Sequence, residues 1–237
     1  MSRLLQAGFL LHSQSYQESS LIVDVFTQVE GRQSIIAKGV KRQKSPFLGL
    51  LRPFIPLNIT YSGRGKLKTL THVEAGNAEF ILPGINTYCG FYLNELIRHF
   101  IPVGEPYSGV FLNYLMCLQQ LKNNINIEAG LRTFEIQLIQ ALGYGLQLES
   151  DFITHRAIEV GLTYRYDIEQ GVTVDNGGGI QGTTLRAMQQ SNYTDQAQLN
   201  EAKWLMRQVI DFYLQGKPLK SRSLISKLMQ KESCKSN

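Results

Sequence analysis

The spacing of hydrophobic residues changes character near residue 80 of this chain. In the first 75 residues, β-branched and aromatic side chains alternate with polar ones in short runs, which is typical of strands with one buried face. We expect strands at residues 6–12, 19–27, 32–38, 51–61 and 66–74. The sequences VEGR and SGRG predict tight turns after the second and fourth strands, and Pro53 and Pro56 predict that the fourth is an edge or bent strand.

Beyond residue 84 the apolar residues recur with a period of 3.6, which indicates amphipathic helices. The first stripe runs from Ile85 to Ile101, ahead of Pro102 and Pro106, and further stripes occupy 111–121 and 131–142, the last ending at Gly143 and Gly145. Residues 146–182 lose this period and are expected to form two short strands with Gly-rich turns. Helices return at 183–190, 197–214 and 218–229, with Pro218 at the first helical position.

These patterns predict an α+β protein of two domains. Five short strands favour a small barrel, and the five-stranded OB-fold is the form most often used for nucleic acid; an SH3-like barrel is the main alternative. We place the OB-fold domain at residues 1–79. A mostly α-helical domain follows at 80–237, with a small β insertion at about 146–182.

The charge of the chain is concentrated in one segment. The whole sequence has 24 Lys and Arg against 19 Asp and Glu, yet residues 31–73 contain nine basic residues and no acidic one. The remainder therefore has 15 basic against 19 acidic residues. The positive electrostatic field of this segment would attract a polyanionic partner. The nine basic residues are Arg32, Lys38, Lys41, Arg42, Lys44, Arg52, Arg64, Lys66 and Lys68.

A basic loop at 39–49, GVKRQKSPFLG, separates two expected strands. Its cations can follow a phosphate backbone, while Phe47, Phe54 and Tyr61 can offer stacking faces to unpaired bases. The alternative is an ordinary solubilising loop, although such loops usually mix both signs of charge. If about five cations reach phosphates, the log–log salt slope on single strands should be near −3.5. The cations expected to make most of these contacts are Lys38, Lys41, Arg42, Lys44, Arg64, Lys66 and Lys68, and Arg52 is a further DNA-binding candidate.

Two nucleotide-binding motifs are matched only in part. SGRGKLKT resembles the end of a P-loop but has Thr60 in place of the first Gly and Leu67 in place of the Ser or Thr that would hold magnesium. GGGIQG, with Gly177, Gly179 and Gly182, fits the dinucleotide fingerprint, but the expected elements after it are helical and supply no second parallel strand. We interpret it as a Gly-rich loop or hairpin.

The sequence contains no recognisable catalytic or metal-binding constellation. His12, His72, His99 and His155 are scattered, and Asp24 and Glu30 form no evident acid–base pair. Cys89, Cys117 and Cys234 lack ligand spacing, so we expect neither zinc nor a disulfide, and we expect Cys89 and Cys117 to be buried thiols. The chain is therefore expected to be no enzyme and to need no cofactor. The start runs directly into polar residues and no stretch is long enough to span a bilayer, so a cytoplasmic location is expected.

Several strings in order along the chain resemble the RecO family of bacterial DNA repair proteins. They are FLLHSQSYQESSLIVDVFT, GRQSIIAKGVKRQKS, LRPFIPL, GRGKLKTLT, FYLNELI, LRTFEIQLIQALGYG and GKPLKSR, and together they cover most of the sequence. The resemblance implies an N-terminal OB-fold, a helical domain and no enzymatic activity. It also implies binding of single- and double-stranded DNA, strand annealing, and cooperation with RecR in loading RecA onto DNA coated by the single-strand-binding protein SSB.

The resemblance also implies residue roles. Family members bind the acidic C-terminal tail of SSB on the helical domain, and the matching helices make Leu96, Arg132, Phe134 and Leu138 the candidates here. From the residues alone, Arg132 beside an apolar pocket could capture a terminal carboxylate, or it could be an exposed helical arginine. The KPLKSR string adds Lys217, Lys220 and Arg222 as a second phosphate-contacting surface or as a solvated helix end.

Many RecO-like chains carry four zinc-binding cysteines after LGYG, but residues 143–182 here contain none. We therefore expect a zinc-ribbon-like insertion without zinc, held by apolar packing of Tyr164, Tyr166 and Val174. The expected function is that of a cytoplasmic repair mediator, nucleoid-associated during repair, with DNA, SSB and RecR as partners, RecA as an indirect one, and no membrane. The leading alternative is a basic OB-fold adaptor that binds RNA, and a DNA-modifying enzyme is a more distant one.

Overall fold

The computed structural model describes residues 5–47, 49–76 and 79–233, which form two compact units. The first unit comprises Met1–Ile125 with Leu219–Asn237, and the second comprises Asn126–Pro218. The OB-fold barrel and three helices belong to the first unit. The second contains three more helices and a small sheet. None of the helices in the described residues is long and apolar enough to cross a membrane.

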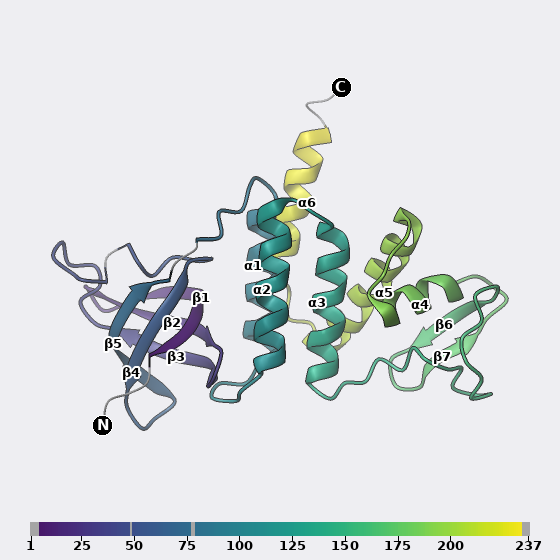
Figure 1. The fold of residues 1–237 in the computed structure, drawn as a ribbon, viewed down its shortest axis with the longest axis horizontal. Helices are drawn as coiled ribbons and strands as arrows, with labels where there is room; N and C mark the ends of the chain where they lie inside the picture. Colours follow the sequence, from purple (N-terminus) through teal and green to yellow (C-terminus); the bar gives the residue numbers. More distant parts are fainter. Residues whose placement is uncertain (1–4, 48, 77–78, 234–237) are drawn as a thin grey trace. The chain divides into compact units, whose positions relative to one another are not determined.

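The first unit begins with a closed five-stranded barrel (Figure 1). Its strands are β1 (Gln6–Tyr16), β2 (Ser20–Thr27), β3 (Gly31–Ala37), β4 (Pro56–Ser62) and β5 (Leu67–Ala75), in the order β1-β2-β3-β5-β4. β3 and β5 are parallel and every other pair is antiparallel. This confirms the OB-fold expected from the alternation of residues.

Strict alternation in β3 gives this strand one buried face. Every second residue of GRQSIIA is buried, and Ile35 and Ala37 of this set join the inward residues of the other strands in the barrel core. The opposite side of the sheet has an aromatic cluster of its own, because Phe9 and Phe26 lie 5.4 Å from Tyr114 and Phe111, respectively, between ring centroids. The barrel is therefore packed on its inside and, at one part of its outside, against α2.

The fourth strand differs from the expectation. It begins at Pro56 rather than at residue 51, and it is not an edge strand, because it pairs with both β1 and β5 in the closed barrel. Pro56 is tolerated at the first strand position, where its missing N–H costs no interior ladder bond. The Pro56 carbonyl still accepts a 2.7 Å hydrogen bond from the Gly76 amide.

Three helices complete the first unit: α1 (Asn86–Phe100), α2 (Ser108–Asn123) and α6 (Lys220–Ser233) (Figure 1). They follow the predicted apolar stripes, and Cys89 and Cys117 are buried as expected, whereas Cys234 lies outside the described residues. Buried Asn94 joins α1 to the barrel, donating to the Leu11 carbonyl at 3.3 Å and accepting from Tyr114 Oη at 2.7 Å. Pro218 does not start α6, which begins two residues later.

The second unit contains α3 (Ile127–Ala141), α4 (Gly182–Gln190), α5 (Gln196–Leu214) and an antiparallel sheet (Figure 1). The sheet has the order β7-β6-β8, with β6 at Thr163–Asp167, β7 at Gly171–Val174 and β8 at Ile180–Gln181. It has one strand more than predicted, because Ile180 and Gln181 pair with β6. Since β8 is antiparallel to β6 and Gly182 starts α4, the GGGIQG string is no dinucleotide-binding turn.

Candidate nucleic-acid interface

The cations of the barrel gather at two places along β3. β5 enters the sheet opposite Ser34 and Ile36, so the β4–β5 turn lies near the start of β3. The basic loop leaves from the other end, after Ala37. Lys41 ties this loop to the β1–β2 turn, because its amide donates to the Ser19 carbonyl at 3.0 Å and its ammonium donates to Ser15 Oγ at 2.9 Å.

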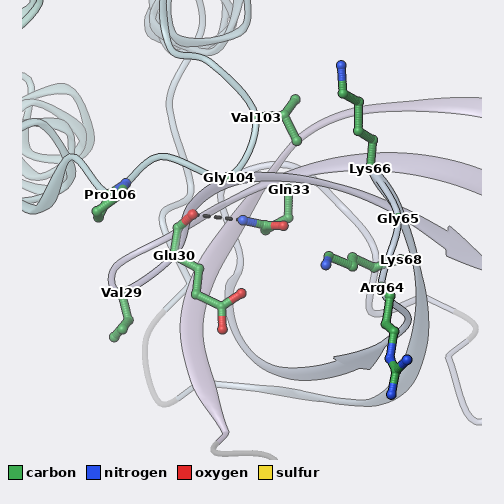
Figure 2. Close-up of a pocket in the computed structure, with 10 residues that line it drawn as sticks. All are labelled: Val29, Glu30, Gln33, Arg64, Gly65, Lys66, Lys68, Val103, Gly104 and Pro106. Atoms are coloured by element: carbon green, nitrogen blue, oxygen red, sulfur yellow. Dashed lines mark hydrogen bonds between the residues drawn. The ribbon is translucent and has the colours of Figure 1, made fainter.

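A pocket of about 500 Å³ lies beside the β4–β5 turn. Figure 2 shows Arg64, Lys66 and Lys68 along one side of it and the Glu30–Gln33 segment across from them. Val29, Val103 and Pro106 add apolar surface from the β2–β3 turn and from the segment between α1 and α2. The pocket thus joins three cations that the sequence singled out to polar and apolar residues from other segments.

Most of the candidate cations are available to an anion. Among the described residues, no carboxylate lies within ion-pair distance of Lys38, Lys41, Arg42, Lys44, Arg64, Lys66 or Lys68. Arg52 differs, because it pairs with Glu79 at 3.7 Å on the exposed surface. Such an exposed pair is weak and can be exchanged for a phosphate.

Two of the three expected stacking residues are buried. Phe54 and Tyr61 are each 6% exposed, so neither presents a free ring face, whereas Phe47 is half-buried against the barrel core. Alternation placed Tyr61 on the inner face of β4, which the aromatic content alone does not reveal. Tyr16 is an aromatic candidate that no sequence pattern singles out; it is 37% exposed at the end of β1, beside the turn that Lys41 contacts.

The phosphate-contacting candidates of the KPLKSR string belong to different units. Lys217 belongs to the second unit, whereas Lys220 and Arg222 belong to the start of α6 in the first. The Arg222 guanidinium lies 5.6 Å from the centre of the Tyr92 ring, and Lys220 is exposed. The α6 N-terminus itself is occupied by a carboxylate, because Glu95 accepts from the Lys220 and Ser221 amides at 2.9 Å each.

The four candidates for the SSB tail are buried. Leu96 is fully enclosed in the first unit, and Phe134 and Leu138 are each 1% exposed in the second. Arg132 is not the exposed arginine of the alternative interpretation, because it is 6% exposed and paired with Glu135. Arg132 Nε donates to Glu135 Oε2 at 2.8 Å, and the Nη2 group donates to Oε1, so the Glu135 carboxylate forms a bidentate ion pair with the guanidinium group.

The β insertion is organised without cysteines. Tyr164 is 1% exposed and packs as expected, but Val174 is 43% exposed and contributes no buried packing. A buried carboxylate links two segments of the insertion instead. Asp151 accepts hydrogen bonds from the amides of Thr154 at 2.6 Å and Val174 at 2.7 Å. Within the described residues no three His, Cys, Asp or Glu side chains gather in a way that could hold a metal ion.

Comparisons with known proteins match this architecture along nearly its whole length. A family profile described as "Recombination protein O N terminal" matches residues 1–78, and one described as "Recombination protein O C terminal" matches residues 84–223. The chain belongs to the RecO family. The two profiles meet near residue 80, whereas the compact units of this RecO-family chain separate after Ile125 and again after Pro218.

Individual relatives carry the same name. The DNA repair protein RecO of Nitrosococcus oceani is 41% identical over 96% of this chain and 95% of its own length. The DNA repair protein RecO of Methylococcus capsulatus is 39% identical over 93% and 92%, and that of Salmonella enteritidis is 38% identical over 97% of both chains. This RecO-family chain is therefore a DNA repair protein.

Proposed function

We propose that this protein is a mediator of DNA repair that binds single- and double-stranded DNA and anneals complementary strands. We further propose that it acts with RecR to help load RecA onto single strands coated by SSB, and that it makes or breaks no covalent bond. The observation that carries this proposal is the set of cations at both ends of β3 that have no ion pair among the described residues, in a barrel segment whose sequence has no acidic residue. Phosphates contacted there would leave the bases free to pair.

The path proposed for one strand runs along the barrel between the two basic places. The β4–β5 turn holds the strand at one end, and the 38–44 loop holds it at the other. Tyr16, exposed beside that loop, offers a stacking face that the buried Phe54 and Tyr61 rings do not.

The proposed function is tested by annealing two labelled complementary DNA strands that are coated with SSB. Lys41→Ala/Arg42→Ala/Lys44→Ala should slow annealing at least severalfold, whereas the control Arg156→Ala/Arg165→Ala/Arg207→Ala removes the same charge from exposed positions of the second unit and should anneal normally. A wild-type protein that fails to anneal at low and moderate salt would contradict the proposal, and RNA would then be the next ligand to test.

We also propose that the SSB tail binds on the second unit, where Arg132 receives its terminal carboxylate and Phe134 and Leu138 are further tail-binding residues; the fourth candidate, Leu96, belongs to the first unit. Because Glu135 holds the guanidinium fork, the incoming carboxylate would have to replace it. A labelled tail peptide should therefore bind more tightly to Glu135→Gln and less tightly to Arg132→Lys, which lacks the planar fork. Equal affinity for both variants and the wild type, at unchanged melting temperature, would refute this assignment.

A further inference from the structure

The pocket beside the β4–β5 turn has two chemically different walls. Arg64, Lys66 and Lys68 supply only hydrogen-bond donors, whereas the opposite wall carries the Glu30 carboxylate and the Gln33 amide. In Figure 2 the Lys68 side chain extends toward Glu30 and Gln33, while Lys66 extends away from them. Among the described residues, no cation lies within ion-pair distance of Glu30, so the pocket itself separates the donors from the acceptor.

The Glu30 carboxylate is held in place from the barrel side. Gln6 Nε2 donates to Oε1 at 2.8 Å, and Tyr61 Oη donates to Oε2 at 2.7 Å. Burial, together with the hydrogen bond to Glu30, raises the pKa of Tyr61, so its hydroxyl keeps its proton and remains a donor. Each carboxylate oxygen has one such partner and can accept a further hydrogen bond.

Gln33 is fixed in one orientation. Its Nε2 donates to the Glu30 carbonyl at 2.7 Å, and the residue is 3% exposed. The Gln33 Oε1 atom therefore remains as a second hydrogen-bond acceptor on this wall of the pocket, beside the Glu30 carboxylate. Glu30 and Gln33 together make a prearranged acceptor surface opposite the cations.

A phosphate does not match this arrangement. It would need donors on every side, and a fixed carboxylate would repel it. A group that carries donors and acceptors on one edge does match, and the volume of about 500 Å³ is in the range of pockets for small planar ligands.

We propose that this pocket binds an unpaired DNA base in which an exocyclic amine adjoins a ring acceptor, as in cytosine and adenine. Glu30 accepts from the amine, Lys68 donates to the ring acceptor, and Val103 and Pro106 contact the ring. Arg64 and Lys66 then contact the flanking phosphates. Thymine presents a carbonyl in place of the amine and is disfavoured against Glu30. This inference rests on the proposed DNA binding and adds a base preference to it.

The test compares fluorescence anisotropy of the full chain with a uniform dT strand and with an alternating dT-dC strand of equal length. We expect about tenfold tighter binding of the alternating strand, in line with the discrimination given by good base-edge hydrogen bonds. A strand with 2-pyrimidinone at each cytosine position lacks the amine and should bind as dT does. This ligand change leaves the protein, and hence its folding, untouched.

Glu30→Gln should abolish the preference between the two strands. The control Glu74→Gln removes the same charge from an exposed β5 residue outside the pocket and should keep the preference. Equal wild-type binding of all three strands would overturn the base pocket while leaving DNA binding intact, as would uniform tightening of every strand by Glu30→Gln. Absence of binding to any strand at low salt would overturn the proposed function and the pocket together.

Discussion

Single buried or half-buried carboxylates fix several local structures in this protein. Glu95 on α1 receives three hydrogen bonds at the start of α6, from the amides of Lys220 and Ser221 and from Ser221 Oγ at 2.6 Å. It acts as an N-cap supplied by another helix, and its negative charge also suits the positive end of the α6 dipole. No local signal in the KPLKSR sequence predicts it, because Glu95 lies 125 residues before Lys220.

Glu95→Ala should lower the free energy of unfolding of the first unit by about 1 kcal/mol, the usual value of a helix cap. Burial by itself would raise the pKa of Glu95, but hydrogen bonds from Ser221 and Lys220 outweigh it and lower the pKa below 4.5. A lowered pKa means that the stabilisation is present above pH 4.5 and is lost as the pH falls through the folded-state value. Urea titrations at neutral and acidic pH check this. The difference from wild type should shrink in acid, and exposed Glu18→Ala should show no such difference.

Arg132→Ala should destabilise the second unit by about 3–5 kcal/mol, because it would leave buried Glu135 without its charge partner. Replacing both residues, as in Arg132→Met/Glu135→Leu, should recover most of that loss, since similar apolar volume can substitute for a buried pair. Chemical denaturation of the two variants measures this. A double variant as unstable as Arg132→Ala would show that other interactions of this pair dominate.

At the scale of elements, the β insertion illustrates how polar side chains help to hold a small sheet. Its sheet is short, and β8 has only two residues. Asp151 links the preceding turn to β7, and Arg186 of α4 donates to the Ile158 carbonyl at 2.7 Å. Polar side chains that satisfy backbone groups therefore add to the packing of Tyr164.

Asp151→Asn should loosen this insertion selectively. The carboxylate accepts four hydrogen bonds, including one from Ile153 and two from Thr154, and an amide can accept only part of them. Hydrogen bonds led by the Thr154 amide outweigh burial and lower the pKa of Asp151, so protection should also fall with pH below 3.8. Hydrogen exchange at Thr154 and Val174 should accelerate in the variant. Asp175→Asn serves as the control, because the Asp175 carboxylate accepts a hydrogen bond from the Gly177 amide in an exposed turn.

At the scale of the whole molecule, charge follows the compact units. The first unit carries 17 Lys and Arg against 8 Asp and Glu, whereas the second carries 7 against 11. The sequence located the basic excess at residues 31–73, and the structure adds the basic residues of α6 to the same unit. Attraction of DNA is therefore expected to come from the first unit.

This division predicts the salt dependence of DNA binding. Lys41→Ala/Arg42→Ala/Lys44→Ala should reduce the magnitude of the log–log salt slope on single strands by about 2, because each cation that no longer reaches a phosphate removes about 0.7 from the slope. The triple variant of Arg156, Arg165 and Arg207 in the second unit should keep the wild-type slope. Binding isotherms between low and moderate salt measure both slopes, and an equal reduction in the two variants would mean that DNA is bound by both units.

The sequence by itself determined the features that depend on near neighbours in the chain. Alternation predicted the strands, the 3.6-residue period predicted the helices, and the run without acidic residues located the basic surface, because each is a local property. Tertiary structure decided which side chains meet and which become buried. Barrel closure brings Gln6, Glu30 and Tyr61 together from three segments, so that both Gln6 and Tyr61 donate hydrogen bonds to the Glu30 carboxylate. Such interactions join distant residues, so no local pattern could specify them.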